Sequence, residues 1–160
     1  MQAAELVIGP FDERHEDALF AAYDEALRDG RSFPRQPPAD RDDLREVWLE
    51  DKAATVAATL DGEFAGFYYL RANFPGRAAH IANAGYLVPN AMRGRGIGRA
   101  LLEHSLDTAR ELGFRAMMFN LVFEHNPARR LWEAAGFEVI GRIPGAIDGE
   151  QDALIYWREL

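Results

Sequence analysis

The chain has 160 residues, of which 48% are hydrophobic, and this predicts a single domain, residues 1–160, with a packed core. Its net charge of −8 disfavours nucleic acids and anionic membranes as partners, and no apolar stretch approaches the roughly 18 residues that span a bilayer. The absence of cysteine excludes disulfides, thiolate metal ligands and a cysteine nucleophile and, with no secretory signal visible at the N-terminus, favours a cytoplasmic location.

The first half of the chain predicts a strand, two helices and the two strands of a hairpin. In chain order these elements cover residues 3–8, 12–28, 39–52, 53–60 and 63–71. The first helix has an apolar face that includes Leu19, Tyr23 and Leu27. Its loop to the second helix is rich in proline, and the hairpin turns at Asp61-Gly62, a strong two-residue turn signal.

The second half predicts a central strand, a helix, a strand, a short helix and two closing strands. These cover residues 79–88, 98–112, 115–122, 127–135, 137–143 and 152–158, with a loop at residues 144–151. Asn126 is a natural N-cap for the short helix, Pro127 suits its first position, and Gly136 suits its C-terminal stop. Strands that alternate with helices in this way predict an α/β fold.

The segment RGRGIGR, residues 93–99, joins the central strand to its helix and predicts an anion site. Glycine lets successive backbone N–H groups point at phosphate oxygens, and the helix N-terminus adds a partial positive charge. Its three arginines add full charges with the fork geometry that suits phosphate. The segment lacks the GK[ST] of a P-loop, and Leu101 stands where the dinucleotide fingerprint needs glycine. A Gly-rich turn with solvated arginines is the alternative.

The strand, the turn, R-x-x-G-x-G and the helix resemble motif A, the pyrophosphate loop of the GNAT acyltransferases, with Arg93, Gly96 and Gly98 at the motif positions. The segment from Asn126 to Phe137 resembles motif B of the same family, in the order and at the separation that the family has. The resemblance implies a GNAT fold, which is a mixed central sheet with a splay between the two motif strands, flanked by about four helices. It also implies acetyl-CoA as co-substrate and no metal.

In such a fold acetyl-CoA would lie across the central strand and the motif A helix. Strand backbone groups would pair with the pantetheine amides, Asn126 would face the pantetheine arm, and the Arg-Gly loop would hold the pyrophosphate. Because the chain as a whole is acidic, a CoA-type ligand needs a local basic patch. The residues expected to bind the cofactor are Leu87, Val88, Arg93, Arg95, Gly96, Ile97, Gly98, Arg99, Asn126 and Arg129.

The chain departs from the common family pattern at two positions. Trp132 stands where many members carry a tyrosine, and because indole cannot act as an acid near neutral pH, we expect a core or wall residue. Ala82 and Asn83 stand where many members place a glutamate on the central strand. The proton chemistry of those two residues is therefore missing here.

The segments around these positions resemble the subgroup of azetidine-2-carboxylate and related L-amino-acid N-acetyltransferases, in which two strand asparagines serve at the active site. The matching residues are Asn83 and Asn120, which we expect to be catalytic. An amide at position 120 costs about 1–3 kcal/mol if it is buried without a partner, so a role for it is expected. A structural role at a strand end or at the splay is the alternative.

The acceptor is expected to be the amine of a small molecule, an amino acid or an analogue, which attacks the thioester directly in a ternary complex. Phe33, in the loop between the first two helices, and Tyr86, on the central strand, are expected to bind it. A protein or peptide N-acetyltransferase and a non-catalytic acyl-CoA-binding module are the alternatives. No His, Asp and Glu cluster has metal-ligand spacing. Dimers are common in the family, which leaves a homodimer open.

Overall fold

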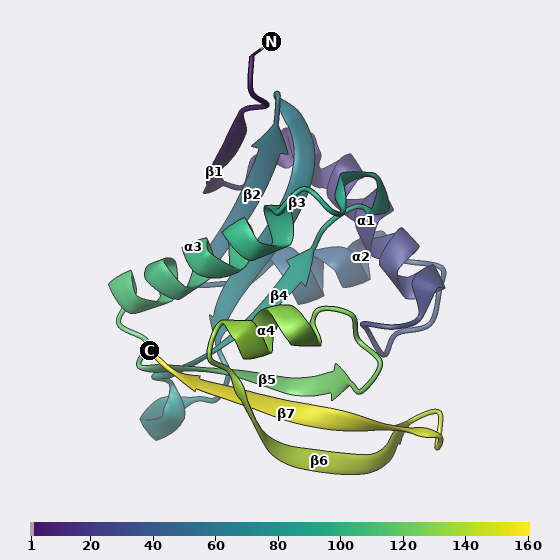
Figure 1. Ribbon diagram of the computed structural model, residues 1–160, viewed down its shortest axis with the longest axis vertical. Helices are drawn as coiled ribbons and strands as arrows, with labels where there is room; N and C mark the ends of the chain where they lie inside the picture. The colour runs from purple at the N-terminus through teal and green to yellow at the C-terminus, as the bar shows by residue number, and fades with distance from the viewer. Residues whose placement is uncertain (1) are drawn as a thin grey trace.

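A seven-stranded sheet in the order β1-β2-β3-β4-β5-β7-β6 organises the chain, which the computed structural model describes from residue 2 to residue 160 (Figure 1). The strands are β1 (Leu6–Pro10), β2 (Ala54–Leu60), β3 (Glu63–Ala72), β4 (Ile81–Leu87), β5 (Ala116–Phe123), β6 (Glu138–Ile147) and β7 (Gln151–Glu159). β4 and β5 are parallel, and the other neighbouring pairs are antiparallel. This is the mixed sheet that the GNAT resemblance implies.

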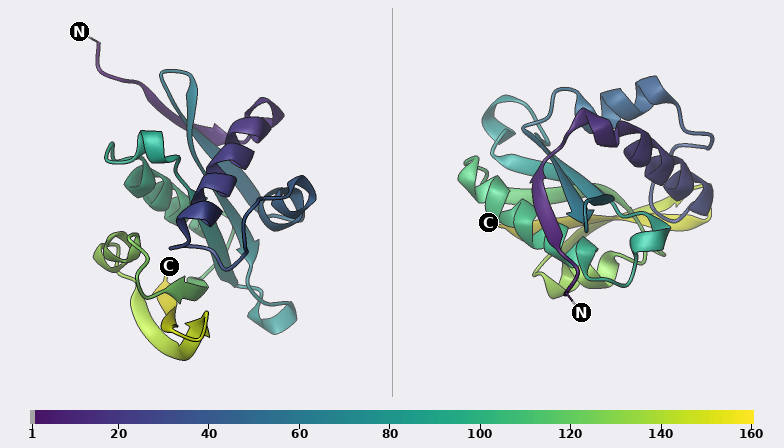
Figure 2. Two further views of the ribbon diagram at one scale, coloured as in Figure 1. Left: turned by 90° about the vertical axis from the view of Figure 1, so that its right-hand side faces the viewer. Right: turned by 90° about the horizontal axis from the view of Figure 1, so that it is seen from above.

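Helices cover both faces of the sheet, with α1 and α2 on one side and α3 and α4 on the other (Figure 2). The helices are α1 (Glu16–Asp29), α2 (Arg41–Leu44), α3 (Ile97–Glu111) and α4 (Arg129–Ala134), and the short turns are η1 (Glu13–His15), η2 (Arg45–Leu49), η3 (Gly76–Ala78) and η4 (Asn90–Met92). Each face has its own apolar core: Leu19 and Trp48 belong to one, Leu101 and Tyr156 to the other. Within residues 2–160, no helix has the length and hydrophobicity to cross a membrane.

Most predicted elements are present, but several bounds differ. The first strand covers residues 6–10 rather than 3–8, and the short helix begins at Arg129 rather than Pro127. The second helix ends at Leu49 rather than Lys52, because its last residues wind into the wider π-type turn η2. The expected loop at residues 144–151 is mostly strand, since β6 runs on to Ile147 and pairs it with Gln151. Pro144 and Gly145 resemble turn residues, but Asp152 Oδ1 accepts a hydrogen bond from the Gly145 N–H at 2.9 Å and keeps the two strands together.

The parallel strands β4 and β5 pair over a short length and then separate. Their paired residues are Ile81 with Ala116 and Ala82 with Met117. β3 pairs with the other edge of β4 as far as Leu87. The edge of β4 that faces β5 is therefore without ladder partners beyond this point, and the predicted splay is confirmed.

Candidate active site

A cavity of about 300 Å³ fills the splay between β4 and β5. Ala84 and Tyr86 of β4 line one side of it, and Phe119 and Val122 of β5 line the other. The start of α3 and the β5–α4 loop line it from one face of the sheet, and residues 32–34 of the α1–α2 loop line it from the other. The cavity is thus lined from both faces, so two molecules can meet in it end to end.

The Arg-Gly loop reaches the cavity from the α3 side. Arg93 and Gly98 line the cavity, and Gly94 and Gly96 have φ angles of +76° and +77°, which favour glycine. Gly96 is also the residue from which α3 begins, and the first N–H groups of a helix have no partner within it. These unpaired donors, beside Arg93, are groups that could hold an anion next to the cavity.

The predicted basic patch is smaller than expected. Arg99 forms an ion pair with Glu103 at 3.1 Å, on the exposed side of α3. Among the ion pairs of residues 2–160, none includes Arg93, Arg95 or Arg130. These three arginines keep their charge available to a ligand on this side of the molecule.

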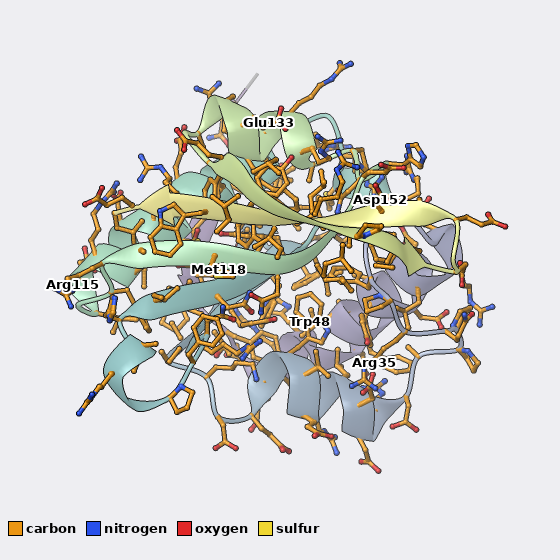
Figure 3. The ribbon with its side chains drawn as sticks, turned by 90° about the horizontal axis from the view of Figure 1, so that it is seen from below. Arg35, Trp48, Arg115, Met118, Glu133 and Asp152 are labelled. Carbon is orange, nitrogen blue, oxygen red and sulfur yellow. The ribbon has the colours of Figure 1, made fainter. Side chains whose placement is uncertain are left out.

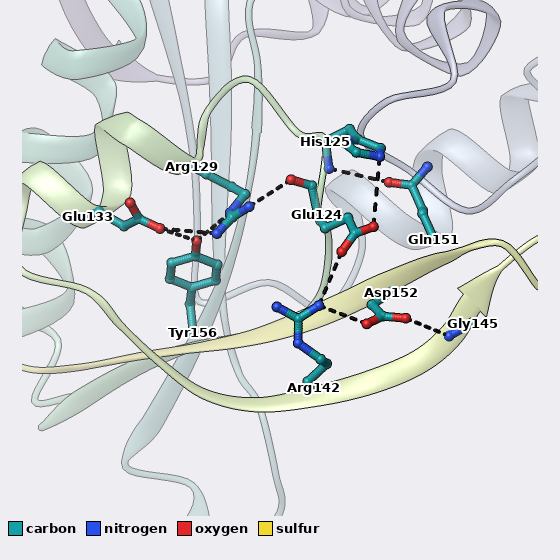
Figure 4. A network of polar contacts seen from close by, with 9 residues as sticks. All are labelled: Glu124, His125, Arg129, Glu133, Arg142, Gly145, Gln151, Asp152 and Tyr156. Carbon is teal, nitrogen blue, oxygen red and sulfur yellow. Dashed lines mark hydrogen bonds and ion pairs between the residues drawn. The ribbon is translucent and has the colours of Figure 1, made fainter.

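Arg129 belongs to a network of polar contacts instead (Figure 4). Its guanidinium donates to Tyr156 Oη at 2.8 Å and to the carbonyl oxygen of Glu124 at 2.7 Å, and Tyr156 Oη donates to Glu133 at 2.7 Å. Because Glu124 follows β5, Arg129 ties the β5–α4 loop to the neighbouring strand β7. The guanidinium that we expected to bind the cofactor is thus committed to the protein itself.

Asn126 caps the β5–α4 turn and also lines the cavity. It is buried, and its Oδ1 accepts a hydrogen bond from the Ala128 N–H at 2.8 Å. Its Nδ2 forms no hydrogen bond within residues 2–160. The carbonyl end of the amide is therefore used by the fold, and the amino end is left for a ligand.

Asn83 and Asn120 both lie near the splay, but neither lines the cavity. Asn83 is buried and donates from Nδ2 to the Met118 carbonyl oxygen at 2.9 Å, which bridges β4 to β5 where they separate. Asn120 is exposed, and it exchanges two hydrogen bonds with Asn73, at 2.7 and 2.8 Å. The cost of a buried, unpartnered amide at position 120 therefore does not arise, since Asn120 is exposed and paired, at the irregular stretch of the β5–β7 ladder between Phe119 and Val122.

The face of the sheet under α1 and α2 carries an aromatic wall. Trp48 packs edge-on against Phe33 and Tyr69, with ring centroids 5.3 and 5.2 Å apart, and Phe33 and Tyr69 line the cavity. Figure 3 shows Trp48 between the sheet and the α2–η2 segment, on the side opposite Glu133 of α4. Phe33 therefore reaches the cavity as expected, whereas Tyr69 was missed.

Two cations lie on the same face. Arg71 pairs with Asn83 in the β3–β4 register, two residues from Tyr69, and side chains of paired residues share a face. Lys52 Nζ lies 5.2 Å from the centroid of the Tyr69 ring and donates to the carbonyl oxygens of Glu46 and Glu50. Neither cation belongs to an ion pair of residues 2–160. Alternation along the predicted strand, residues 63–71, places Tyr69 and Arg71 on one face, and this pattern could have linked the two residues to each other.

The titratable side chains that line the cavity are Arg93 and two tyrosines. Burial raises the pKa of Tyr69 and of Tyr86, and the Tyr86 hydroxyl lies 2.7 Å from Ser105 Oγ. Trp132 is buried against Phe119, as a wall residue should be. No carboxylate or histidine lines the cavity within the described chain, and residues 2–160 contain no group of three or more potential metal ligands.

Comparisons with known proteins agree with this architecture. The family model described as "Acetyltransferase (GNAT) family" matches residues 17–137. N-acetyltransferase aca1 of Schizosaccharomyces pombe is 39% identical over 109 residues, which are 64% of this chain and 52% of that protein, so the chain spans about half of its length. YwnH of Bacillus subtilis, named provisionally as a phosphinothricin acetyltransferase, is 31% identical over 159 residues, 93% of this chain and 96% of that one. The structure of a GCN5-related N-acetyltransferase from Kribbella flavida is 32% identical, with a TM-score of 0.90 and coverage of 97% and 98%.

Proposed function

The chain belongs to the acetyltransferase (GNAT) family, and from this premise we propose that it acetylates the amine of a small molecule, an amino acid or a close analogue. Family membership makes the protein an N-acetyltransferase with acetyl-CoA as its co-substrate. The acceptor, and the residues that bind each reactant, are the proposed part.

Acetyl-CoA enters from the α3 side of the cavity in this proposal. Arg93, with the backbone N–H groups of residues 95–99, holds the pyrophosphate, and Arg95 adds charge. The free edge of β4 near Leu87 and Val88 offers backbone groups to the pantetheine amides, and Asn126 Nδ2 donates to the same arm. The support is the open ladder edge, the unpaired helix donors and the unused amide nitrogen.

The acceptor enters from the opposite face. One observation carries the choice of an amino acid: Arg71 and Lys52 stand beside Tyr69 on this face, and no carboxylate lines the cavity within the described residues. A carboxylate on the acceptor would find full positive charge behind Tyr69, next to the cavity wall. The local cations outweigh the net charge of −8, because charges far from a site are screened over about 10 Å at moderate ionic strength.

The reaction is a direct transfer between two oriented reactants. The acceptor nitrogen attacks the thioester carbonyl carbon, the carbonyl becomes an oxyanion, and the C–S bond then breaks to release CoA as the thiolate. With no carboxylate or histidine on the cavity wall of the described chain, the amine loses its proton to water, and the same water can protonate the thiolate. Neither asparagine lines the cavity, so in this proposal both are positioning residues: Asn83 holds Tyr69 and the β5 backbone, and Asn120 acts from the exposed side of the splay.

Calorimetry with acetyl-CoA, followed by a CoA-release assay on a panel of amines, tests this function. We expect binding of acetyl-CoA and the fastest CoA release with L-amino acids or their analogues. Decarboxylated amines matched to each amino acid form the control, since they keep the nucleophile and lose only the carboxylate. Turnover on peptides alone would point to a peptide N-acetyltransferase, and binding without turnover on any amine would point to a binding module.

A further inference from the structure

Tyr69 forms the wall at the acceptor end of the cavity, and we propose that its ring sets the largest acceptor that the site admits. This inference rests on the proposed function, because it concerns the acceptor of that same reaction. Tyr69 lines the cavity together with Phe33 from the opposite loop, and its ring is buried. The ring therefore lies where an acceptor side chain would have to pass.

Gly85 is the residue that allows the ring to lie there. Gly85 and Tyr69 are register partners in β4 and β3. A Cβ atom on Gly85 would lie 2.4 Å from Tyr69 Cε1 and 2.9 Å from Cζ, distances that real Cβ atoms do not reach. The ring thus rests directly on the β4 backbone, at the stretch where β4 has left β5 and borders the cavity.

The ring is held from several sides and is a fixed wall. Trp48 packs against it at an interplanar angle of 79°, and Lys52 Nζ lies over it. The Tyr69 hydroxyl approaches Asn83 Oδ1 at 3.4 Å. Because cores that are packed in this way resist rearrangement, an acceptor too large for the space meets a steric barrier.

Tyr68, the adjacent residue, is a matched control. It points to the other face of the sheet, where its hydroxyl lies 2.7 Å from His104 Nδ1 and donates to Thr108 Oγ1 at 3.0 Å. It is buried like Tyr69, but it does not line the cavity. A Tyr68→Phe change therefore alters a buried tyrosine without altering the acceptor space.

The test measures kcat/KM for L-amino acids of increasing side-chain volume with Tyr69→Ala, Tyr69→Phe and Tyr68→Phe. Tyr69→Ala should raise the ratio of kcat/KM for large acceptors to kcat/KM for small acceptors by about tenfold or more. A few methylene groups of added space in an apolar pocket have an effect of this size. Tyr69→Phe and Tyr68→Phe should keep this ratio within about twofold of wild type. Tyr69→Leu replaces Tyr69→Ala if thermal denaturation shows the latter unfolded.

Gly85→Ala supplies a second perturbation. A methyl group there displaces the Tyr69 ring and also meets Trp48, so Gly85→Ala should change the kcat/KM ratio of large to small acceptors, and the double variant Gly85→Ala/Tyr69→Ala should return it to the value of Tyr69→Ala. An unchanged ratio in Tyr69→Ala that still binds acetyl-CoA and turns over an amino acid would overturn this inference alone. A wild-type protein that binds acetyl-CoA but acetylates no amine would overturn the proposed function, and this inference with it.

Discussion

Replacing Asn83 with alanine removes a side-chain bridge between β4 and β5 at the point where they separate. The bridge is the 2.9 Å hydrogen bond from Asn83 Nδ2 to the Met118 carbonyl oxygen, and Asn83 is only 6% exposed. Its loss deprives a half-buried carbonyl of a donor and leaves a small void. We expect the free energy of unfolding to fall by about 1–3 kcal/mol.

That loss is measurable but does not unfold the protein. For a domain of this size, each kcal/mol corresponds to roughly 2–4 °C in Tm, so circular dichroism should show a fall of about 2–12 °C. Domains are commonly stable by about 5–15 kcal/mol, so the variant remains folded at 25 °C. A drop in kcat/KM by tenfold to a thousandfold at that temperature would then report on the site itself.

Asn120→Ala should lower kcat/KM over the same range with a much smaller change in Tm, because Asn120 is exposed. Asn73→Ala is its control, since it breaks the same two hydrogen bonds and leaves the Asn120 amide in place. The reasoning fails if both asparagine variants keep wild-type kcat/KM on the best acceptor. In that case Asn83 only braces the strands and Asn120 only pairs with the β3–β4 turn.

Three further predictions follow from the cavity wall. Arg93→Glu should weaken acetyl-CoA binding by tenfold or more in calorimetry with Tm little changed, because it adds a carboxylate at the proposed anion site. Gly96→Asp should weaken binding similarly and remain folded, with some fall in Tm because φ at Gly96 is +77°; wild-type affinity in both variants would place the pyrophosphate elsewhere. Trp132→Phe should keep most of its activity, since indole transfers no proton, and a loss beyond about a thousandfold with acetyl-CoA binding intact would contradict this. The reaction rate should rise with pH toward the pKa of the acceptor amine, because burial raises the pKa of Tyr69 and Tyr86 and keeps both hydroxyls neutral over that range. A rate that levels off near pH 5 or 6 would instead indicate an enzyme carboxylate or histidine acting as the base.

Turns and helix ends whose conformation depends on neighbouring residues in the chain were predictable from the sequence. The Arg-Gly loop is a continuous segment whose function depends on its own backbone, so Gly94 and Gly96 adopt the conformations that their identity suggests. The same holds for the stop at Gly136, where φ is +91°, whereas Asn126 caps the turn before α4 and the N-cap of that helix is Ala128. Such signals need no knowledge of distant partners.

Features that depend on distant partners were not predictable. Arg129 seemed free for the cofactor because its acceptor, Tyr156, lies 27 residues away on β7. The exposure of Asn120 was not evident because its neighbours are apolar, and nothing local marks the break in the β5–β7 ladder. Tyr69 enters the site through its register with Gly85 on β4, and no short turn signal in the segment between β3 and β4 fixes that register.

The passage through the sheet between β4 and β5 also bears on the order of events in a catalytic cycle. Residues from both faces of the sheet line the cavity, and in the proposed function the nucleotide and the amine therefore approach it from opposite faces. Neither reactant blocks the approach of the other, and each product can depart by the side from which its parent came. If the proposed function holds, the two substrates can bind in either order, and initial-rate kinetics with both substrates varied should show no compulsory order of addition.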